Sequence, residues 1–167
     1  GNAGTDRVYG QDGNDFVYGG DGDDIVSGGL GTDFVDGGAG IDTASFRYSL
    51  AGVTFSLAIT TAQNTTSEGM DTYINVENSE GSEFSDTLIG NSGNNVINGR
   101  GGADILNGGT GIDDLSYESS LLGVTANLTT GTGSGGDAEG DVLSNFENIR
   151  GSSEGDNLTG SSAANTI

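Results

Sequence analysis

Apolar residues in the first part of this chain recur every nine positions, and glycine-rich polar segments separate them. Residues 1–45 divide into five nonapeptides, each with glycine at positions one and four, aspartate at six, and valine or alanine at eight. The eighth residue is apolar between mostly polar neighbours, the alternation expected of a short strand buried on one face. The glycines permit tight turns. The pattern therefore predicts a turn plus a short strand in each nonapeptide, which is stable only when stacked on others.

The same phase returns twice later in the chain. Residues 81–116 form four further nonapeptides, and residues 151–167 form one more and an incomplete last one. We expect the eighth-position residues to form the core: Val8, Val17, Val26, Val35, Leu88, Ile97, Leu106, Leu115, Leu158 and Ile167.

Two irregular inserts, residues 46–80 and 117–150, interrupt the phase and are copies of each other. The segment Gly52-Val53-Thr54 recurs as Gly123-Val124-Thr125, so a unit of about 70 residues is duplicated over 28–98 and 99–167. Apolar residues alternate from Val53 to Ile59, which is strand period. We expect one continuous solenoid in which each insert adds about two irregular coils. Its parts are 1–45, 46–80, 81–116, 117–150 and 151–167.

The sixth-position aspartates are the candidate metal ligands. If two nonapeptides complete an 18-residue coil, Asp6 lies near Asp24 and Asp15 lies near Asp33 on successive coils. Strands stack ~4.8 Å apart, and two carboxylates ~6 Å apart repel by roughly 3 kcal/mol. Calcium between the turns would reverse that sign, because it accepts carboxylate and carbonyl oxygens. The predicted ligands are Asp6, Asp15, Asp24, Asp33, Asp42, Asp86, Asn95, Asp104, Asp113 and Asp156.

Asparagine replaces aspartate at two sixth positions, Asn95 and Asn165. An amide oxygen brings no charge, so we expect these sites to be weak or empty. The inserts end in acidic turns that are either solvated surface or additional calcium sites. Their acidic residues are Glu68, Asp71, Asp137, Glu139 and Asp141.

The charge balance changes the expectation for folding. The chain has 25 acidic and 4 basic residues, a net charge of −21, 33 glycines, and no proline, cysteine, histidine or tryptophan. Such a composition is typical of a chain that does not fold unaided. Because the chain has no disulfide, a bound metal is the cross-link that could stabilise its fold. The acidity excludes nucleic acid and anionic membranes as favoured partners. No catalytic constellation is present, so we expect no enzyme activity.

The repeat Gly-Gly-x-Gly-x-Asp-x-apolar-x is the known signature of the calcium-binding nonapeptides of RTX proteins, and this chain resembles that haemolysin-type family. The resemblance implies an all-β fold, a right-handed parallel β-roll or β-solenoid with calcium bound in the turns, here of about nine coils. It also implies export by type I secretion, with folding on calcium outside the cell. The expected location is therefore secreted, extracellular or at the cell surface.

Two classes of function remain open. One is a calcium-dependent structural module of an adhesin, surface layer or fibre, which the internal duplication favours because tandem units build length. The other is a non-catalytic accessory module of a secreted polysaccharide-modifying or hydrolytic enzyme, with extracellular polysaccharide as a partner. Ile167 stops one residue short of a complete repeat and neither end has a cap. We therefore expect either a window of a longer array or end-to-end stacking into a filament.

Outward-facing aromatic residues are expected at seventh and ninth positions, with Phe16 and Phe34 stacked on one sheet beside Tyr18. They are interpreted either as strand-forming surface residues or as a contact surface.

Overall fold

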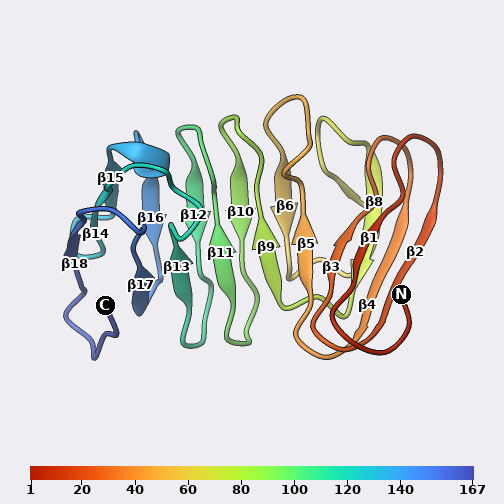
Figure 1. Ribbon diagram of the computed structural model, residues 1–167, viewed down its shortest axis with the longest axis horizontal. Coiled ribbons are helices and arrows are strands. Elements are labelled where there is room, and N and C mark those ends of the chain that lie inside the picture. The colour runs from red at the N-terminus through yellow and green to blue at the C-terminus, as the bar shows by residue number, and fades with distance from the viewer.

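The computed structural model describes residues 1–167 as a single elongated stack of short strands joined by turns. Figure 1 shows the strands side by side along the long axis, with the N-terminal coils at one end and the C-terminal coils at the other. Apart from one short 3₁₀ helix, η1 (Gly136–Ala138), all regular structure is β. This confirms the predicted all-β solenoid of parallel strands. No helix is long and apolar enough to cross a membrane.

One sheet runs through the whole molecule. Its seven strands are parallel and occur in the order β1 (Arg7–Tyr9), β3 (Ile25–Ser27), β5 (Thr43–Ser45), β9 (Asn78–Glu80), β11 (Val96–Asn98), β13 (Asp114–Ser116) and β17 (Asn148–Arg150). Regular neighbours are 18 residues apart, as in the pairing of Val8 with Val26. The 18-residue coil predicted from the nonapeptides is thereby confirmed.

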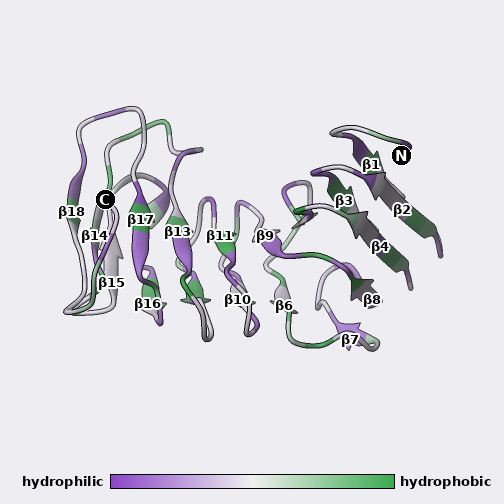
Figure 2. Cartoon of the chain, turned by 90° about the horizontal axis from the view of Figure 1, so that it is seen from below, coloured by the Kyte–Doolittle hydropathy of each residue, from purple (hydrophilic) through white to green (hydrophobic).

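The opposite side of the solenoid consists of two sheets. The first contains β2 (Phe16–Asp21), β4 (Phe34–Ala39), β8 (Met70–Ile74) and β7 (Gln63–Asn64). The second contains β18 (Asn157–Thr159), β14 (Thr125–Asn127), β15 (Thr132–Ser134), β16 (Val142–Ser144), β12 (Ile105–Asn107), β10 (Thr87–Ile89) and β6 (Thr54–Ser56). In Figure 2, β2, β4 and β8 form a group separate from β6 and β10.

Each insert widens one coil instead of adding two. The strands that flank the first insert, β5 and β9, pair directly, with Ala44 opposite Ser79. On the opposite side the chain passes to β6, which pairs with β10, and then turns back through β7 to β8, which pairs with β4. The second insert repeats this path with β14, β15 and β16. The long sheet therefore has seven strands, one for each coil, and the expectation of about nine coils is wrong.

In the regular repeats the core consists of eighth-position residues, which form two rows, one from each side of the solenoid. Val26, Val35, Leu88, Ile97, Leu106 and Leu115 are all fully buried. Val8 and Leu158, near the two ends, are only partly buried, and Ile167 is 62% exposed. The prediction that Ile167 is a core residue is wrong, because no following rung covers it.

Aromatic side chains fill the extra space that the first insert creates. Phe46, Phe55 and Tyr73 are buried and their ring centroids lie 4.9–5.6 Å apart. Within the predicted alternating segment, Val53, Phe55 and Leu57 point inward, whereas Ile59 is 43% exposed. The insert is thus part of the same hydrophobic core as the regular repeats.

The predicted outward aromatic row is present on β2 and β4. The ring centroid of Phe34 lies 6.1 Å from that of Phe16 and 6.2 Å from that of Tyr18. Phe16 is 75% exposed.

Candidate metal centre

The turns of the regular repeats form narrow cradles because glycine occupies positions where a side chain would collide with the chain. Gly22, a fourth-position residue, has φ +123°, and a Cβ there would lie 2.7 Å from the carbonyl oxygen of Gly4 on the adjacent coil. At Gly19, a first-position residue, a Cβ would lie 2.6 Å from Oδ2 of Asp24 and would also meet the carbonyl oxygen of Gly37. Each cradle therefore brings a carboxylate and a backbone carbonyl of the next coil together.

The sixth-position aspartates link successive coils through hydrogen bonds. The backbone N–H of Asp6 donates to Oδ1 of Asp24 over 2.7 Å, and that of Asp24 donates to Oδ1 of Asp42 over 2.8 Å. On the other edge, the N–H of Asp15 donates to Oδ1 of Asp33 over 2.8 Å. These pairs are the ones that the 18-residue period predicts. They form two files, which we call the first and second ladders.

Both ladders extend into the inserts by way of residues outside the nonapeptide phase, but only the first passes through them. In the first ladder, the N–H of Asp42 donates to Oε2 of Glu77 and that of Asp113 donates to Oε2 of Glu147, both over 2.9 Å. The members of the first ladder are Asp6, Asp24, Asp42, Glu77, Asn95, Asp113, Glu147 and Asn165.

The second ladder uses the acidic turns at the ends of the inserts. The N–H of Asp33 donates to Oδ1 of Asp71 and that of Asp104 donates to Oδ1 of Asp141, both over 2.9 Å. Asp71 and Asp141 are buried, whereas Asp137 is only partly buried and Glu139 is exposed. The second ladder restarts after each insert, where Oδ1 of Asp86 accepts the N–H of Val53 and Oδ1 of Asp156 accepts that of Val124. Its segments are Asp15–Asp33–Asp71, Asp86–Asp104–Asp141 and Asp156.

The second carboxylate oxygen divides the ladder residues into two groups. In six of them Oδ2 is buried and has no hydrogen-bond partner: Asp15, Asp24, Asp33, Asp42, Asp104 and Asp113. A buried, ionised oxygen without a partner is costly. These six orphan oxygens are what a bound cation would satisfy, and hard cations such as calcium prefer carboxylate and carbonyl oxygens.

In the other group, a donor from the protein replaces the cation. The hydroxyls of Thr65 and Tyr117 donate to Oδ2 of Asp71 and Asp141 over 2.5 and 2.8 Å. The backbone N–H of Ser82 donates to Oδ2 of Asp86 over 2.6 Å, and the N–H of Asn2 donates to Oδ2 of Asp6 over 2.9 Å. At Asp156 the Ser152 hydroxyl donates to Oδ1 over 2.8 Å, and the residue is only partly buried.

The asparagines of the first ladder show this replacement most directly. The Asn95 amide donates to the carbonyl oxygen of Glu77 over 2.6 Å, and the Asn165 amide donates to that of Glu147 over 2.5 Å. The amide nitrogen lies where an aspartate places its ladder oxygen, facing the preceding coil, and Oδ1 of Asn95 accepts the N–H of Asn91 over 2.8 Å. We still expect these two sites to be weak or empty, because both asparagine amides have partners within the chain.

Burial, with neighbouring negative charge, raises the pKa of several ladder carboxyls. Burial is the main cause at Asp104, whose pKa rises to about 8, and at Asp141, whose pKa rises to about 6. Burial likewise raises the pKa values of Asp33, Asp42 and Asp113. No arginine forms an ion pair with these carboxylates, so they lack compensating positive charge within the chain; Arg100, for example, pairs with Glu80 and Glu83.

No group of three or more acidic side chains converges on one point. Each candidate site therefore combines carboxylates of two adjacent coils with backbone carbonyls of the turns. Sequence reasoning missed Glu77 and Glu147 as ladder members. A signal existed, because Val76-Glu77-Asn78 recurs as Phe146-Glu147-Asn148.

Glycine turns, paired carboxylates on successive coils and a core of eighth-position residues together define a parallel β-solenoid of the kind built for metal binding. The family model for the RTX calcium-binding nonapeptide repeat, in four copies, matches residues 1–35, 21–44 and 80–115. Residues 1–44 and 80–115 therefore consist of RTX calcium-binding nonapeptide repeats. A search of curated proteins gives no significant match.

Proposed function

We propose that this chain is a calcium-stiffened structural module of a large extracellular protein of the adhesin, surface-layer or fibre type. Its RTX repeats indicate a calcium-binding module of a secreted protein. The observation that supports a structural role is the long sheet, which passes both inserts without interruption from β1 to β17. Because the inserts preserve this sheet, repeating the duplicated unit lengthens the rod without adding a second domain.

In this proposal calcium occupies the cradles with orphan oxygens, at Asp15, Asp24, Asp33, Asp42, Asp104 and Asp113. The remaining predicted ligands, Asp6, Asp86, Asn95 and Asp156, have protein donors on their side-chain oxygens and contribute less. The chain leaves the cell unfolded by type I secretion, and binding energy then becomes folding energy outside. The module is not catalytic: its most buried carboxylates accept backbone hydrogen bonds within the ladders.

Small-angle X-ray scattering with and without calcium tests this proposal. An unfolded chain of this length has a radius of gyration of about 43 Å, whereas a compact folded one has about 15 Å, and an elongated solenoid lies somewhat above the folded value. We expect the measured radius to fall from near the first value to near the second when calcium is added. A compact particle in chelator would contradict the proposal.

End-to-end stacking is a finer form of the same proposal. The free edges of β1 and β18, each hydrogen-bonded to one strand only, offer surfaces where it would occur. Light scattering that rises with calcium supports stacking. The alternative, an accessory module of a secreted enzyme, is favoured if adjacent coding sequence specifies a catalytic domain.

A further inference from the structure

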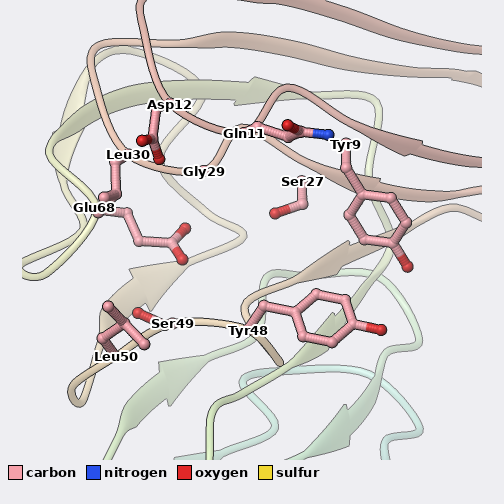
Figure 3. A pocket seen from close by; sticks show the side chains of 10 residues that line it. All are labelled: Tyr9, Gln11, Asp12, Ser27, Gly29, Leu30, Tyr48, Ser49, Leu50 and Glu68. Atoms are coloured by element: carbon pink, nitrogen blue, oxygen red, sulfur yellow. The ribbon is translucent and has the colours of Figure 1, made fainter.

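A cavity of about 520 Å³ lies outside the ladders, between the first two coils and the first insert. Figure 3 shows Glu68 pointing into this cavity, with Tyr9 and Tyr48 at one end and Leu30 and Leu50 at the other. Its volume is in the range of small-ligand pockets. The calcium ladders do not account for this cavity.

The floor of the cavity contains an uncompensated acid. Glu68 is 6% exposed, and its Oε2 is buried without a hydrogen-bond partner. The nearest arginine in sequence, Arg47, lies 4.0 Å from Glu80 and 5.5 Å from the centre of the Tyr48 ring, and it makes no ion pair with Glu68. The protein itself therefore supplies no counter-charge for this carboxylate.

The second insert provides an internal comparison, because its equivalent residues lie 71 positions later. There Asn98 and Ser119 replace Ser27 and Tyr48, and the Asn98 amide donates to the Ser119 hydroxyl over 3.0 Å. That hydroxyl donates to Oδ2 of Asp137 over 3.2 Å. Hydrogen bonds thus join the groups that stay apart in the first insert.

The equivalent acid has also changed its role. Glu139, which corresponds to Glu68, is exposed, and its Oε2 accepts the N–H of Gly135 over 2.7 Å. Only the first insert therefore combines an open cavity with a buried carboxylate whose Oε2 has no hydrogen-bond partner.

The walls indicate what kind of ligand fits. Calcium needs six to eight oxygens, but Tyr9, Tyr48, Leu30 and Leu50 present mainly carbon to the cavity. An anion is disfavoured by Glu68, by Asp12 at the rim and by the net charge of −21. Aromatic rings, in contrast, attract organic cations. We propose that this cavity binds an alkylammonium group, with the ammonium on Glu68 and the aliphatic chain between the tyrosines and leucines.

Two sources could supply such a group, a free aliphatic amine or a lysine side chain of a protein. Isothermal titration calorimetry on the calcium-loaded, folded chain distinguishes them with cadaverine and N-acetyl-lysine methylamide as probes. 1-Pentanol serves as the neutral analogue. The titrations use about 0.15 M salt to screen the acidic surface. We expect saturable binding of one amine per chain, at least roughly tenfold tighter than binding of 1-pentanol, because a charge-assisted hydrogen bond is lost in the alcohol.

Matched variants locate the site. Glu68→Gln should weaken amine binding roughly tenfold or more, whereas Glu139→Gln, at the equivalent position of the second insert, should leave it unchanged. Circular dichroism in calcium checks the fold of both variants. If Glu68→Gln does not fold, Tyr48→Ser replaces it, because Tyr48 is 71% exposed and serine is the residue found at this place in the second insert.

Tighter binding of cadaverine indicates a free amine as the ligand, and tighter binding of N-acetyl-lysine methylamide indicates a lysine side chain. Either preference supports the proposal. Binding of 1-pentanol as tight as that of both amines would overturn it. Equal losses in Glu68→Gln and Glu139→Gln would do so too, because the amine would then be held by the acidic surface in general. These results are independent of the calcium-folding proposal, since every titration begins with a chain already shown to be folded.

Discussion

At the scale of single residues, the feature that governs this molecule is the second oxygen of each ladder carboxylate. Where a protein group donates to this oxygen, as Thr65 does to Asp71, the carboxylate has its hydrogen-bond partners without a metal. Where nothing donates, as at Asp24, a buried acceptor remains. One nonapeptide pattern therefore includes rungs that need a cation and rungs that do not.

Exchanging aspartate and asparagine in the first ladder should convert one type of rung into the other. We expect Asp24→Asn to weaken calcium binding at that rung by roughly tenfold or more, because the ligand charge is lost. Without calcium, the same variant should be more stable than the parent, because the amide can donate to a carbonyl as Asn95 does to Glu77. Calcium titrations followed by thermal unfolding with and without chelator measure both effects.

The reciprocal variant, Asn95→Asp, is the control. It removes the donor to the Glu77 carbonyl and should lower stability in chelator while increasing the response to calcium. The interpretation of the orphan oxygens would be wrong if both exchanges changed stability in the same direction under both conditions.

Lowering the pH should stabilise the calcium-free fold in part, as calcium does. Burial raises the pKa of Asp104 to about 8 and that of Asp141 to about 6 in the folded chain, above the ordinary value of 3.8. Such groups stabilise the fold fully below their unfolded pKa, and this stability is lost as the pH rises through the folded pKa. The calcium-free chain should therefore retain more β structure near pH 5 than near pH 8. Circular dichroism against pH in chelator tests this, and more β structure at the higher pH would contradict it.

Residue-scale prediction from sequence was limited by the nonapeptide phase. The period of 18 residues correctly predicted that Asp6 lies beside Asp24 and Asp15 beside Asp33. It missed Glu77 because this residue stands out of phase, and its longer side chain reaches the rung from there. The donors Thr65 and Tyr117 were also missed, because no local spacing connects a hydroxyl in an insert to a carboxylate several residues away.

At the scale of elements, each insert is a hairpin set into one side of a coil. In the second insert, β15 hydrogen-bonds to both β14 and β16, so that side remains one sheet. In the first insert no strand ladder joins β6 to β7. The buried side chain of Gln63 spans this break instead, accepting the N–H of Ser56 over 2.9 Å and donating to its carbonyl oxygen over 3.1 Å.

Gln63→Ala should therefore destabilise the calcium-loaded chain. Two backbone groups lose their partner, and an unsatisfied buried polar group costs about 1–3 kcal/mol. Ser134→Ala, 71 positions later and exposed, should change stability by less than about 0.5 kcal/mol. Denaturant unfolding of both variants gives the comparison. Equal effects would show that the glutamine does not hold the two sheets together.

The path of the inserts could not be predicted from their sequence. Alternation from Val53 to Leu57 correctly indicated inward-facing residues. Nothing in the alternation indicates that β8 returns to β4 while β6 advances to β10, since this order depends on long-range pairing. The length of each insert, close to two coils, led to the wrong coil count.

At the scale of the whole molecule, the negative charge disfavours the compact folded state, whereas the stacked topology brings the charged groups together. The chain has a net charge of −21, and most buried carboxylates lie in two files along the solenoid. Self-repulsion disfavours the compact state, and the short strands bury at most two residues each. The fold class was predictable because the nonapeptide phase is strict, whereas the cavity at Glu68 depends on differences between two similar inserts.

The most direct test of the account is far-ultraviolet circular dichroism of the purified chain during a calcium titration. We predict a cooperative change from coil to β structure at roughly 0.1–1 mM calcium, and no such change with magnesium, which demands stricter octahedral geometry. A β spectrum that is the same in chelator and in calcium would contradict the central claim, because the carboxylate ladders would then hold together without a cation.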